Sequence, residues 1–260
     1  MIIAFLGDVV GKPGRRTVDR VIPKLKQQHR VDLIIANVEN SAGGFGITQK
    51  ALGELERAGV DFFTSGNHIW DKREGVGLLN SRNNIVRPAN YPGRDHGRGF
   101  RVINVGDKPV AVMNVQGRVF MPPLDCPFRT IDLCLQNVGD GCPVKIVDMH
   151  AEATSEKRAM GWYLDGRVSA VLGTHTHIPT RDAQILPGGT AYVTDVGMTG
   201  SNDSVLGISK KPVIQRFLDM RPTRFEVARH DLRCDFVIMD IDEATGKAVN
   251  IEHLQLKVEE

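Results

Sequence analysis

The chain has no apolar run long enough to cross a membrane. Although 41% of its 260 residues are hydrophobic, no stretch approaches the roughly 18 consecutive apolar residues of a spanning helix. The amino terminus has no basic segment before its first short apolar run, so we expect a strand there and not a signal peptide. These absences predict a cytoplasmic protein that does not associate with a membrane.

The chain also lacks an excess of either charge and any close pair of cysteines. It has 33 Lys and Arg against 31 Asp and Glu, a formal net charge of +2, so we expect no broad nucleic-acid-binding surface. The cysteines show no Cys-x-x-Cys spacing, which argues against a zinc finger or a disulfide framework. We predict free or buried thiols in a reducing compartment at Cys126, Cys134, Cys142 and Cys234.

What the chain does contain is a regular alternation of short apolar runs and amphipathic segments. This order predicts an α/β fold with parallel strands joined by right-handed crossovers. No linker separates two parts, so we predict a single domain over residues 1–260. The expected strands are 2–7, 32–38, 61–65, 110–115, 144–149, 168–172, 191–194 and 225–229, with a closing hairpin of 235–241 and 251–258; the expected helices are 17–28, 48–59, 129–137 and 154–164, and 81–107 is expected to be a loop with short strands.

Metal-binding types of side chain follow five of these apolar runs. In open α/β sheets the carboxyl ends of the strands meet at one edge, where ligands bind. A single Asp after a strand is usually a helix cap, but five such ends without a cysteine predict a metal centre. The residues are Asp8, Glu39, Asn40, Asn67, His68, His150, His175 and His177.

This number of candidate ligands exceeds what one tetrahedral zinc ion takes. It suits two metal ions about 3.5–4 Å apart, with Glu39 as the bridge because each of its oxygens can bind one ion. Carboxylate, amide and imidazole groups favour iron, manganese or zinc over calcium. Two such ions can hold a hydroxide at neutral pH and neutralise a phosphoryl group during in-line attack, which predicts hydrolysis of a small phosphate ester.

Asn67 and His68 are adjacent on one predicted loop, and neighbouring side chains rarely reach the same ion. We therefore assign Asn67 to the metal and His68 to protonation of the leaving oxygen. The alternative is that His68 only supports a ligand through a hydrogen bond. Asp71 or another group could fix the tautomer of its ring.

Several short motifs resemble the ordered motifs of the calcineurin-like metallophosphoesterases: Gly7-Asp8, Gly66-Asn67-His68, His150 and Gly173-Thr174-His175-Thr176-His177. Two positions depart from that pattern. The superfamily usually has Asp-x-His in its first motif, whereas Asp8 is followed by Val9 and Val10. Its second motif is usually Gly-Asp and here is Glu39-Asn40, so the Asn40 amide could replace the missing imidazole.

These departures, together with segments 39–44, 150–157 and 194–200, closely resemble the bacterial YmdB-like subfamily almost end to end. The resemblance implies a metallophosphoesterase-like sandwich of mixed β-sheets flanked by helices, with the metal site at the strand carboxyl ends. It also implies a phosphodiesterase acting on cyclic nucleotides, notably 2′,3′-cyclic ones, with a dinuclear iron or manganese centre. The implied ligands are Asp8, Glu39, Asn40 and His177 for one ion and Glu39, Asn67, His150 and His175 for the other, with His68 as proton donor.

Two other functions remain open from the sequence. A phosphomonoesterase such as a nucleotidase would need a cation beside the metals, for which Arg118 and Lys157 are candidates. A regulatory protein could use the same metal site to bind RNA or a nucleotide with little turnover. The closing hairpin also offers an edge at which a homo-oligomer could form.

Three smaller expectations concern segments near the predicted site. We expect Thr154 or Ser155 to cap the helix that follows His150. The glycine-rich loop 43–46 could cradle a phosphate or form a tight turn. Tyr192 and Trp162 are expected in the core.

Overall fold

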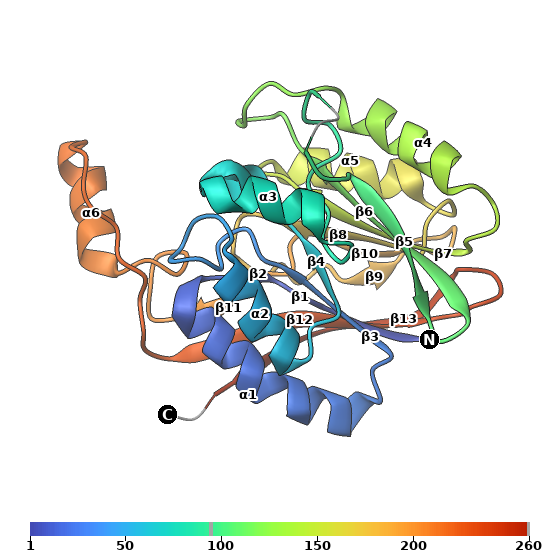
Figure 1. The fold of residues 1–260 in the computed structure, drawn as a ribbon, viewed down its shortest axis with the longest axis horizontal. Coiled ribbons are helices and arrows are strands. Elements are labelled where there is room, and N and C mark those ends of the chain that lie inside the picture. The colour runs from blue at the N-terminus through green and yellow to red at the C-terminus, as the bar shows by residue number, and fades with distance from the viewer. Residues whose placement is uncertain (94–95, 259–260) are drawn as a thin grey trace.

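The computed structural model describes residues 1–93 and 96–258 and shows two β-sheets packed face to face between outer layers of helices (Figure 1). This mixed α/β arrangement confirms the predicted fold class. Both sheets contain parallel and antiparallel strand pairs.

The first sheet has the strand order β2-β11-β12-β1-β3-β4, and β13 pairs with β12. Strands β1, β3 and β4 run parallel, as the strand–helix alternation predicts. The long carboxyl-terminal hairpin adds to this sheet, because β12 lies antiparallel to β1. The strands are β1 (Ile2–Leu6), β2 (Asp8–Val9), β3 (Leu33–Asn37), β4 (Phe62–Thr64), β11 (Met198–Ser201), β12 (Leu232–Ile241) and β13 (Ala248–Lys257).

The second sheet has the order β5-β6-β7-β8-β10-β9. Its four central strands are parallel, and the two edge strands pair antiparallel. The strands are β5 (Phe100–Val105), β6 (Lys108–Gln116), β7 (Val144–His150), β8 (Ala170–Thr174), β9 (Gln184–Ile185) and β10 (Ala191–Val193).

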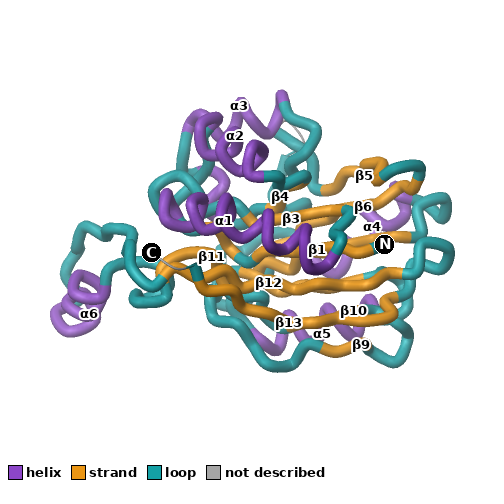
Figure 2. Tube along the Cα trace, turned by 90° about the horizontal axis from the view of Figure 1, so that it is seen from below, coloured by secondary structure: helices purple, strands orange, loops and turns teal. Residues whose placement is uncertain are grey.

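Five of the six α-helices found in the described residues cover the sheets, and one projects away from them. Figures 1 and 2 show α6 standing clear of the body at one end of the molecule. The helices are α1 (Gly11–His29), α2 (Gln49–Ala58), α3 (Arg73–Ser81), α4 (Pro127–Val138), α5 (Thr154–Leu164) and α6 (Lys210–Asp219), with a 3₁₀ turn η1 (Asn67–Trp70).

Alternating side chains of each buried strand supply the two faces of its sheet. In β1, Ile3 and Phe5 pack into the core between the sheets. Ala4 and Leu6 pack against the layer of α1 and α2. Because both faces are covered, the strand reads as a continuous apolar run, as is typical of parallel sheets between helices.

Most predicted elements are confirmed with small differences at their ends. Helix α5 spans the predicted residues, and α2 begins after Thr48, whose hydroxyl accepts a hydrogen bond from the Ala51 amide at 3.2 Å. Gly59 ends α2 with φ of 105°, a backbone conformation that glycine adopts readily. Helix α1 is longer than predicted and begins at Gly11.

Three expectations were wrong. Segment 225–229 forms only an isolated bridge between Val227 and Ile208, and not a strand. Trp162 is 50% exposed, because it lies on the outer side of α5, whereas Tyr192 is buried as predicted. The residue before α5 is Ala153, and neither Thr154 nor Ser155 caps the helix.

The cysteines are free, as predicted, and Cys134, Cys142 and Cys234 are buried. Burial raises the pKa of Cys134 to about 11 and that of Cys234 to about 12. These thiols are therefore neutral at physiological pH. None of the helices in the described part of the chain has the length and apolar character to cross a membrane.

Candidate metal centre

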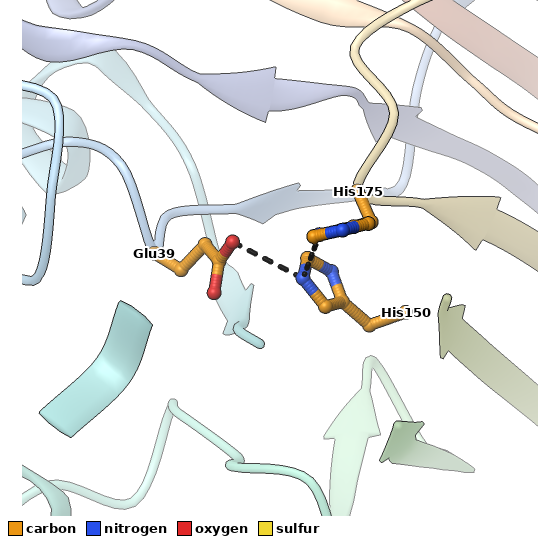
Figure 3. A group of neighbouring side chains, drawn as sticks. All are labelled: Glu39, His150 and His175. Carbon is orange, nitrogen blue, oxygen red and sulfur yellow. Dashed lines mark hydrogen bonds and ion pairs between the residues drawn. The ribbon is translucent and has the colours of Figure 1, made fainter. Parts of the chain in front are cut away.

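The carboxyl ends of strands from both sheets meet at one place. The first sheet delivers Glu39 just after β3, and the second delivers His150 at the end of β7 and His175 just after β8. Figure 3 shows these three side chains pointing toward one another. One ligand atom from each lies within 4.8 Å of the others, so this group could hold a metal ion.

The inward-facing nitrogen of His150 is the centre of the first group of atoms. Its Nε2 lies 3.1 Å from Glu39 Oε1, 3.1 Å from Asn67 Oδ1 and 3.1 Å from His175 Nδ1. A carboxylate, an amide oxygen and a second imidazole thus surround one ring nitrogen. These are the donor types that bind borderline transition metals.

A second group of atoms lies around His177. Its Nε2 is 3.3 Å from Asn40 Oδ1 and 3.8 Å from Asp8 Oδ1. Asp8 is fully buried, and its Oδ1 has no hydrogen-bond partner among the residues that the structure describes. Burial raises the pKa of Asp8. Because an unpaired buried carboxylate oxygen is costly, this atom fits a site for a cation.

Hydrogen bonds on the outer side of His150 determine which of its nitrogens faces the cluster. Thr174 Oγ1 donates to Asp148 Oδ1 at 2.7 Å, so this hydroxyl accepts from His150 Nδ1, 2.8 Å away. Because Nδ1 holds its proton in this hydrogen bond, Nε2 is the nitrogen that can bind a metal ion, once it has lost its own proton. The buried residues Asp148 and Thr174 therefore orient the ring for coordination.

His177, Asn40 and His175 are also held by polar partners on the side that faces away from the cluster. His177 Nδ1 lies 3.0 Å from the Leu206 carbonyl oxygen, which leaves Nε2 for the cluster. Asn40 Nδ2 donates to the Gly44 carbonyl at 3.0 Å, so its Oδ1 faces His177. His175 Nε2 lies 3.2 Å from Glu152 Oε2, which leaves Nδ1 facing His150.

The local charges keep a carboxylate and a neutral imidazole in the first group. Burial opposes the charge of Glu39, but the neighbouring His150 and His68 outweigh burial and lower its pKa to about 2. Burial and the adjacent His150 lower the pKa of His175 to about 3. For His150 burial is outweighed by the Glu39, Asp8 and Asp148 carboxylates, which raise its pKa to about 9.

His68 lies beside the cluster and is linked to it through its backbone. Its amide donates to Glu39 Oε2 at 2.7 Å, while its ring Nδ1 lies 2.8 Å from Asp71 Oδ2. Asp71 is therefore the group that orients this ring, the first of the two options left open by the sequence. The ring also meets Phe45 edge to face, with centroids 4.9 Å apart.

These groups form one end of a cavity of about 810 Å³. Asp8, Asn67 and His150 do not line it, and five of the predicted site residues do: Glu39, Asn40, His68, His175 and His177. The eight predicted residues thus converge, with some buried behind the cavity wall and others open to a ligand.

The glycine-rich loop beside the cavity is a tight turn. Gly43, Gly44 and Gly46 all have positive φ, and the Ala42 amide donates to the Gly46 carbonyl at 3.0 Å. The Gly44 amide is also used inside the loop, where it donates to the Asn40 carbonyl at 3.2 Å. The contact between Gly44 and the Asn40 side chain shows that this turn orients a candidate ligand.

The loop that carries His175 and His177 is held in a strained conformation. Their φ angles are 98° and 63°, in the left-handed region that non-glycine residues rarely adopt. Asp195 holds the residue between them, because its Oδ2 accepts from Thr176 N at 3.1 Å and from Thr176 Oγ1 at 2.8 Å. Lys157 completes this support with an ion pair of 2.6 Å to the same oxygen.

Lys157 was a candidate cation for a monoester substrate, and its position contradicts that role. Its side chain is only 1% exposed and is paired with the equally buried Asp195. Neither Lys157 nor Arg118 is among the described residues that line the cavity. Glu156 has a similar supporting function, since it accepts hydrogen bonds from the amides of Arg118 and Val119.

The chain matches the model of the YmdB-like protein family over residues 4–254. It belongs to the YmdB-like family. It is 48% identical over 254 residues to the 2′,3′-cyclic-nucleotide 2′-phosphodiesterase of Bacillus subtilis (strain 168), a match that covers 98% of this chain and 96% of that relative. The resemblance inferred from the motifs is therefore confirmed.

Two solved structures show the same fold as this YmdB-like chain. A hypothetical protein from Thermus thermophilus has a TM-score of 0.93 and 44% identity, covering 99% of each chain. A phosphatase from Mycoplasma pneumoniae has a TM-score of 0.93 and 32% identity, covering 99% of this chain and 93% of that one.

Segments 150–157 and 194–200 contain Glu152, Lys157 and Asp195, whose supporting contacts the sequence alone did not predict.

Replacement of Lys157 by Met should strongly destabilise the protein. Loss of one partner from a buried ion pair leaves an uncompensated charge and costs about 3–5 kcal/mol. Arg167→Met is the matched control, because Arg167 pairs with Asp132 at 2.6 Å while 42% exposed, and such a surface pair contributes about 1 kcal/mol or less. Urea unfolding measures both free energies, and equal small losses would contradict the supporting role of Lys157.

Proposed function

We propose that this YmdB-like protein is a metal-dependent phosphodiesterase that hydrolyses cyclic nucleotides, with 2′,3′-cyclic ones preferred. The chain is a phosphoric ester hydrolase, and the diesterase activity is supported by its similarity to the 2′,3′-cyclic-nucleotide 2′-phosphodiesterase of Bacillus subtilis. The observation that carries the proposal is the convergence of Glu39, His150 and His175 beside the unpaired buried oxygen of Asp8.

The two groups of atoms support a centre of two metal ions. One ion would be held around His177 and the other around His150, with Glu39 between them. Carboxylate, amide and imidazole donors suit iron or manganese, and zinc as a third choice. When bound, such ions lower the pKa of water and neutralise phosphoryl charge. The ligand sets are Asp8, Glu39, Asn40 and His177, and Glu39, Asn67, His150 and His175.

Both sheets contribute residues to this proposed centre. Glu39 and Asp8 come from the first sheet, while His150 and His175 come from the second. Neither sheet could form the site alone. This sharing supports our proposal that residues 1–260 form a single domain.

His68 supplies the proton in the proposed reaction. Hydrolysis of a cyclic diester adds water to phosphorus and breaks one bond from phosphorus to a ribose oxygen. That oxygen leaves as a hydroxyl group and needs a proton. The Asp71 carboxylate, 2.8 Å from Nδ1, holds the His68 ring in place, and this ring is the candidate general acid.

The cavity favours a diester over a monoester. A monoester carries two negative charges and would gain from a cation close to the metals. Among the described residues that line the cavity, the only Lys or Arg is Arg216, on the projecting helix α6. The regulatory alternative predicts binding without product, and the same assay distinguishes it from hydrolysis.

The first test is a product assay on protein loaded with manganese or iron. We expect cleavage of 2′,3′-cyclic AMP and bis-p-nitrophenyl phosphate, while p-nitrophenyl phosphate is spared. His68→Ala should lower kcat by about a hundredfold to ten-thousandfold and leave two metal ions bound. His29→Ala is the control because His29 lies near the end of α1, outside the site.

Three results of this assay would contradict the proposal. Loss of metal in His68→Ala would place His68 among the ligands and remove its role as proton donor. Preference for the monoester would support the nucleotidase alternative. Two bound ions without turnover of any ester would support the regulatory one.

Metal affinity should rise with pH. The pKa of His150 is raised to about 9, so below that pH a metal ion must displace one proton from its ring. The apparent affinity for Mn²⁺ should therefore increase about tenfold for each pH unit between about pH 6.5 and 8.5. Competition with a chelator of known pH behaviour measures this slope, and an affinity independent of pH would contradict His150 as a ligand.

A further inference from the structure

The cavity continues outward from the candidate metal centre into a slot with apolar walls. Phe45, in the glycine-rich loop, lies on one side beside His68. The segment after β11 contributes the lining residues of the other side, among them Leu206, Ile208, Phe217 and Phe225. We call this region the apolar slot.

Both walls of the apolar slot are tied to candidate metal ligands. The Phe45 loop accepts a hydrogen bond from the Asn40 side chain through the Gly44 carbonyl at 3.0 Å. On the other wall, the Leu206 carbonyl lies 3.0 Å from His177 Nδ1. The walls are therefore held at a fixed position relative to the reacting centre, as expected for a preformed substrate site.

The charges of the cavity divide it into two ends. The carboxylates of Glu39 and Glu152 and the imidazoles of His175 and His177 lie at the metal end. In the apolar slot, Arg216 is the one charged side chain among the described lining residues. Its guanidinium carbon lies 5.3 Å from the centroid of the Phe225 ring. Such a slot suits an uncharged planar group and offers little for a second phosphate.

Phe45 is placed to contact such a group. Gly44 and Gly46 flank it with φ of 102° and 73°, so the turn presents the ring at the edge of the cavity. The ring is 36% exposed, and it meets His68 edge to face with an interplanar angle of 60°. Part of the ring is therefore free to stack on a ligand whose phosphate lies beside His68.

We propose that the apolar slot is the nucleobase subsite and that Phe45 stacks on the base of a mononucleotide substrate. This inference rests on the proposed phosphodiesterase function. A cyclic mononucleotide has one phosphate at one end and an uncharged aromatic base at the other, which matches the two ends of the cavity. An oligonucleotide would bring further phosphates for which the slot provides no matching row of cations.

The test compares two cyclic diesters that differ only in the base. One is 2′,3′-cyclic AMP, and the other is methyl ribofuranoside 2,3-cyclic phosphate, in which a methoxy group replaces adenine. We expect the wild-type protein to have a kcat/KM for the adenine substrate that is about tenfold or more above its kcat/KM for the methyl riboside. The reason is that stacking on an aromatic side chain contributes about 1–3 kcal/mol per base.

Phe45→Leu should remove most of this preference by raising KM for 2′,3′-cyclic AMP, while kcat for both substrates stays near the wild-type value. Leucine keeps an apolar side chain beside His68 but cannot stack, whereas Phe45→Trp should retain the preference. Phe120→Ala is the matched control, since Phe120 is 90% exposed and does not line the cavity.

Several outcomes would overturn the subsite. Equal kcat/KM of the wild-type protein for both substrates would show that the base is not recognised. An equal fall of kcat for both substrates in Phe45→Leu would show that Phe45 acts through His68. No turnover of either diester by the metal-loaded protein would overturn the proposed function itself, and the subsite with it.

A second copy of the chain is the competing occupant of this surface. Phe217 and Met220 line the cavity and are 77% and 81% exposed. Sedimentation velocity of the wild type and of Phe217→Glu tests this alternative. A change from oligomer to monomer with higher activity on the adenine substrate would show that another copy covers the slot, which would overturn the proposal.

Discussion

The Glu39 carboxylate links the residues that the two sheets contribute to the candidate site. Its Oε1 lies 3.1 Å from His150 Nε2 on the second sheet, and its Oε2 accepts the backbone amide of His68 at 2.7 Å. Glu39 itself follows β3 of the first sheet and is 1% exposed. A buried carboxylate needs compensating partners, and Glu39 finds them in the second sheet and in the η1 turn.

Outer hydrogen bonds make this arrangement specific. Asp148 and Thr174 orient His150, while the Leu206 carbonyl orients His177. The Lys157–Asp195 pair supports the strained backbone between His175 and His177. The protein therefore holds carboxylate, amide and imidazole groups in place before any ion binds, as is typical of a site preorganised for metal ions.

The sequence predicts the core of this molecule well because burial on both faces leaves a readable pattern. The runs that became β1, β3, β7 and β8 carry the site residues at their carboxyl ends, and topology brings those ends together. The supporting groups were harder to predict. The charged residue Lys157 reads as a surface residue until its buried partner Asp195, distant in sequence, is known. Helix α6 was missed because it projects from the body, and only Val213 in it is buried.

We propose that two metal ions bind on either side of Glu39. Anomalous diffraction at the manganese absorption edge from crystals of manganese-loaded protein tests it most directly. We expect two peaks about 3.5–4 Å apart, one beside His177 and Asp8 and the other beside His150 and His175. A single peak, or peaks that do not contact Glu39, would contradict it.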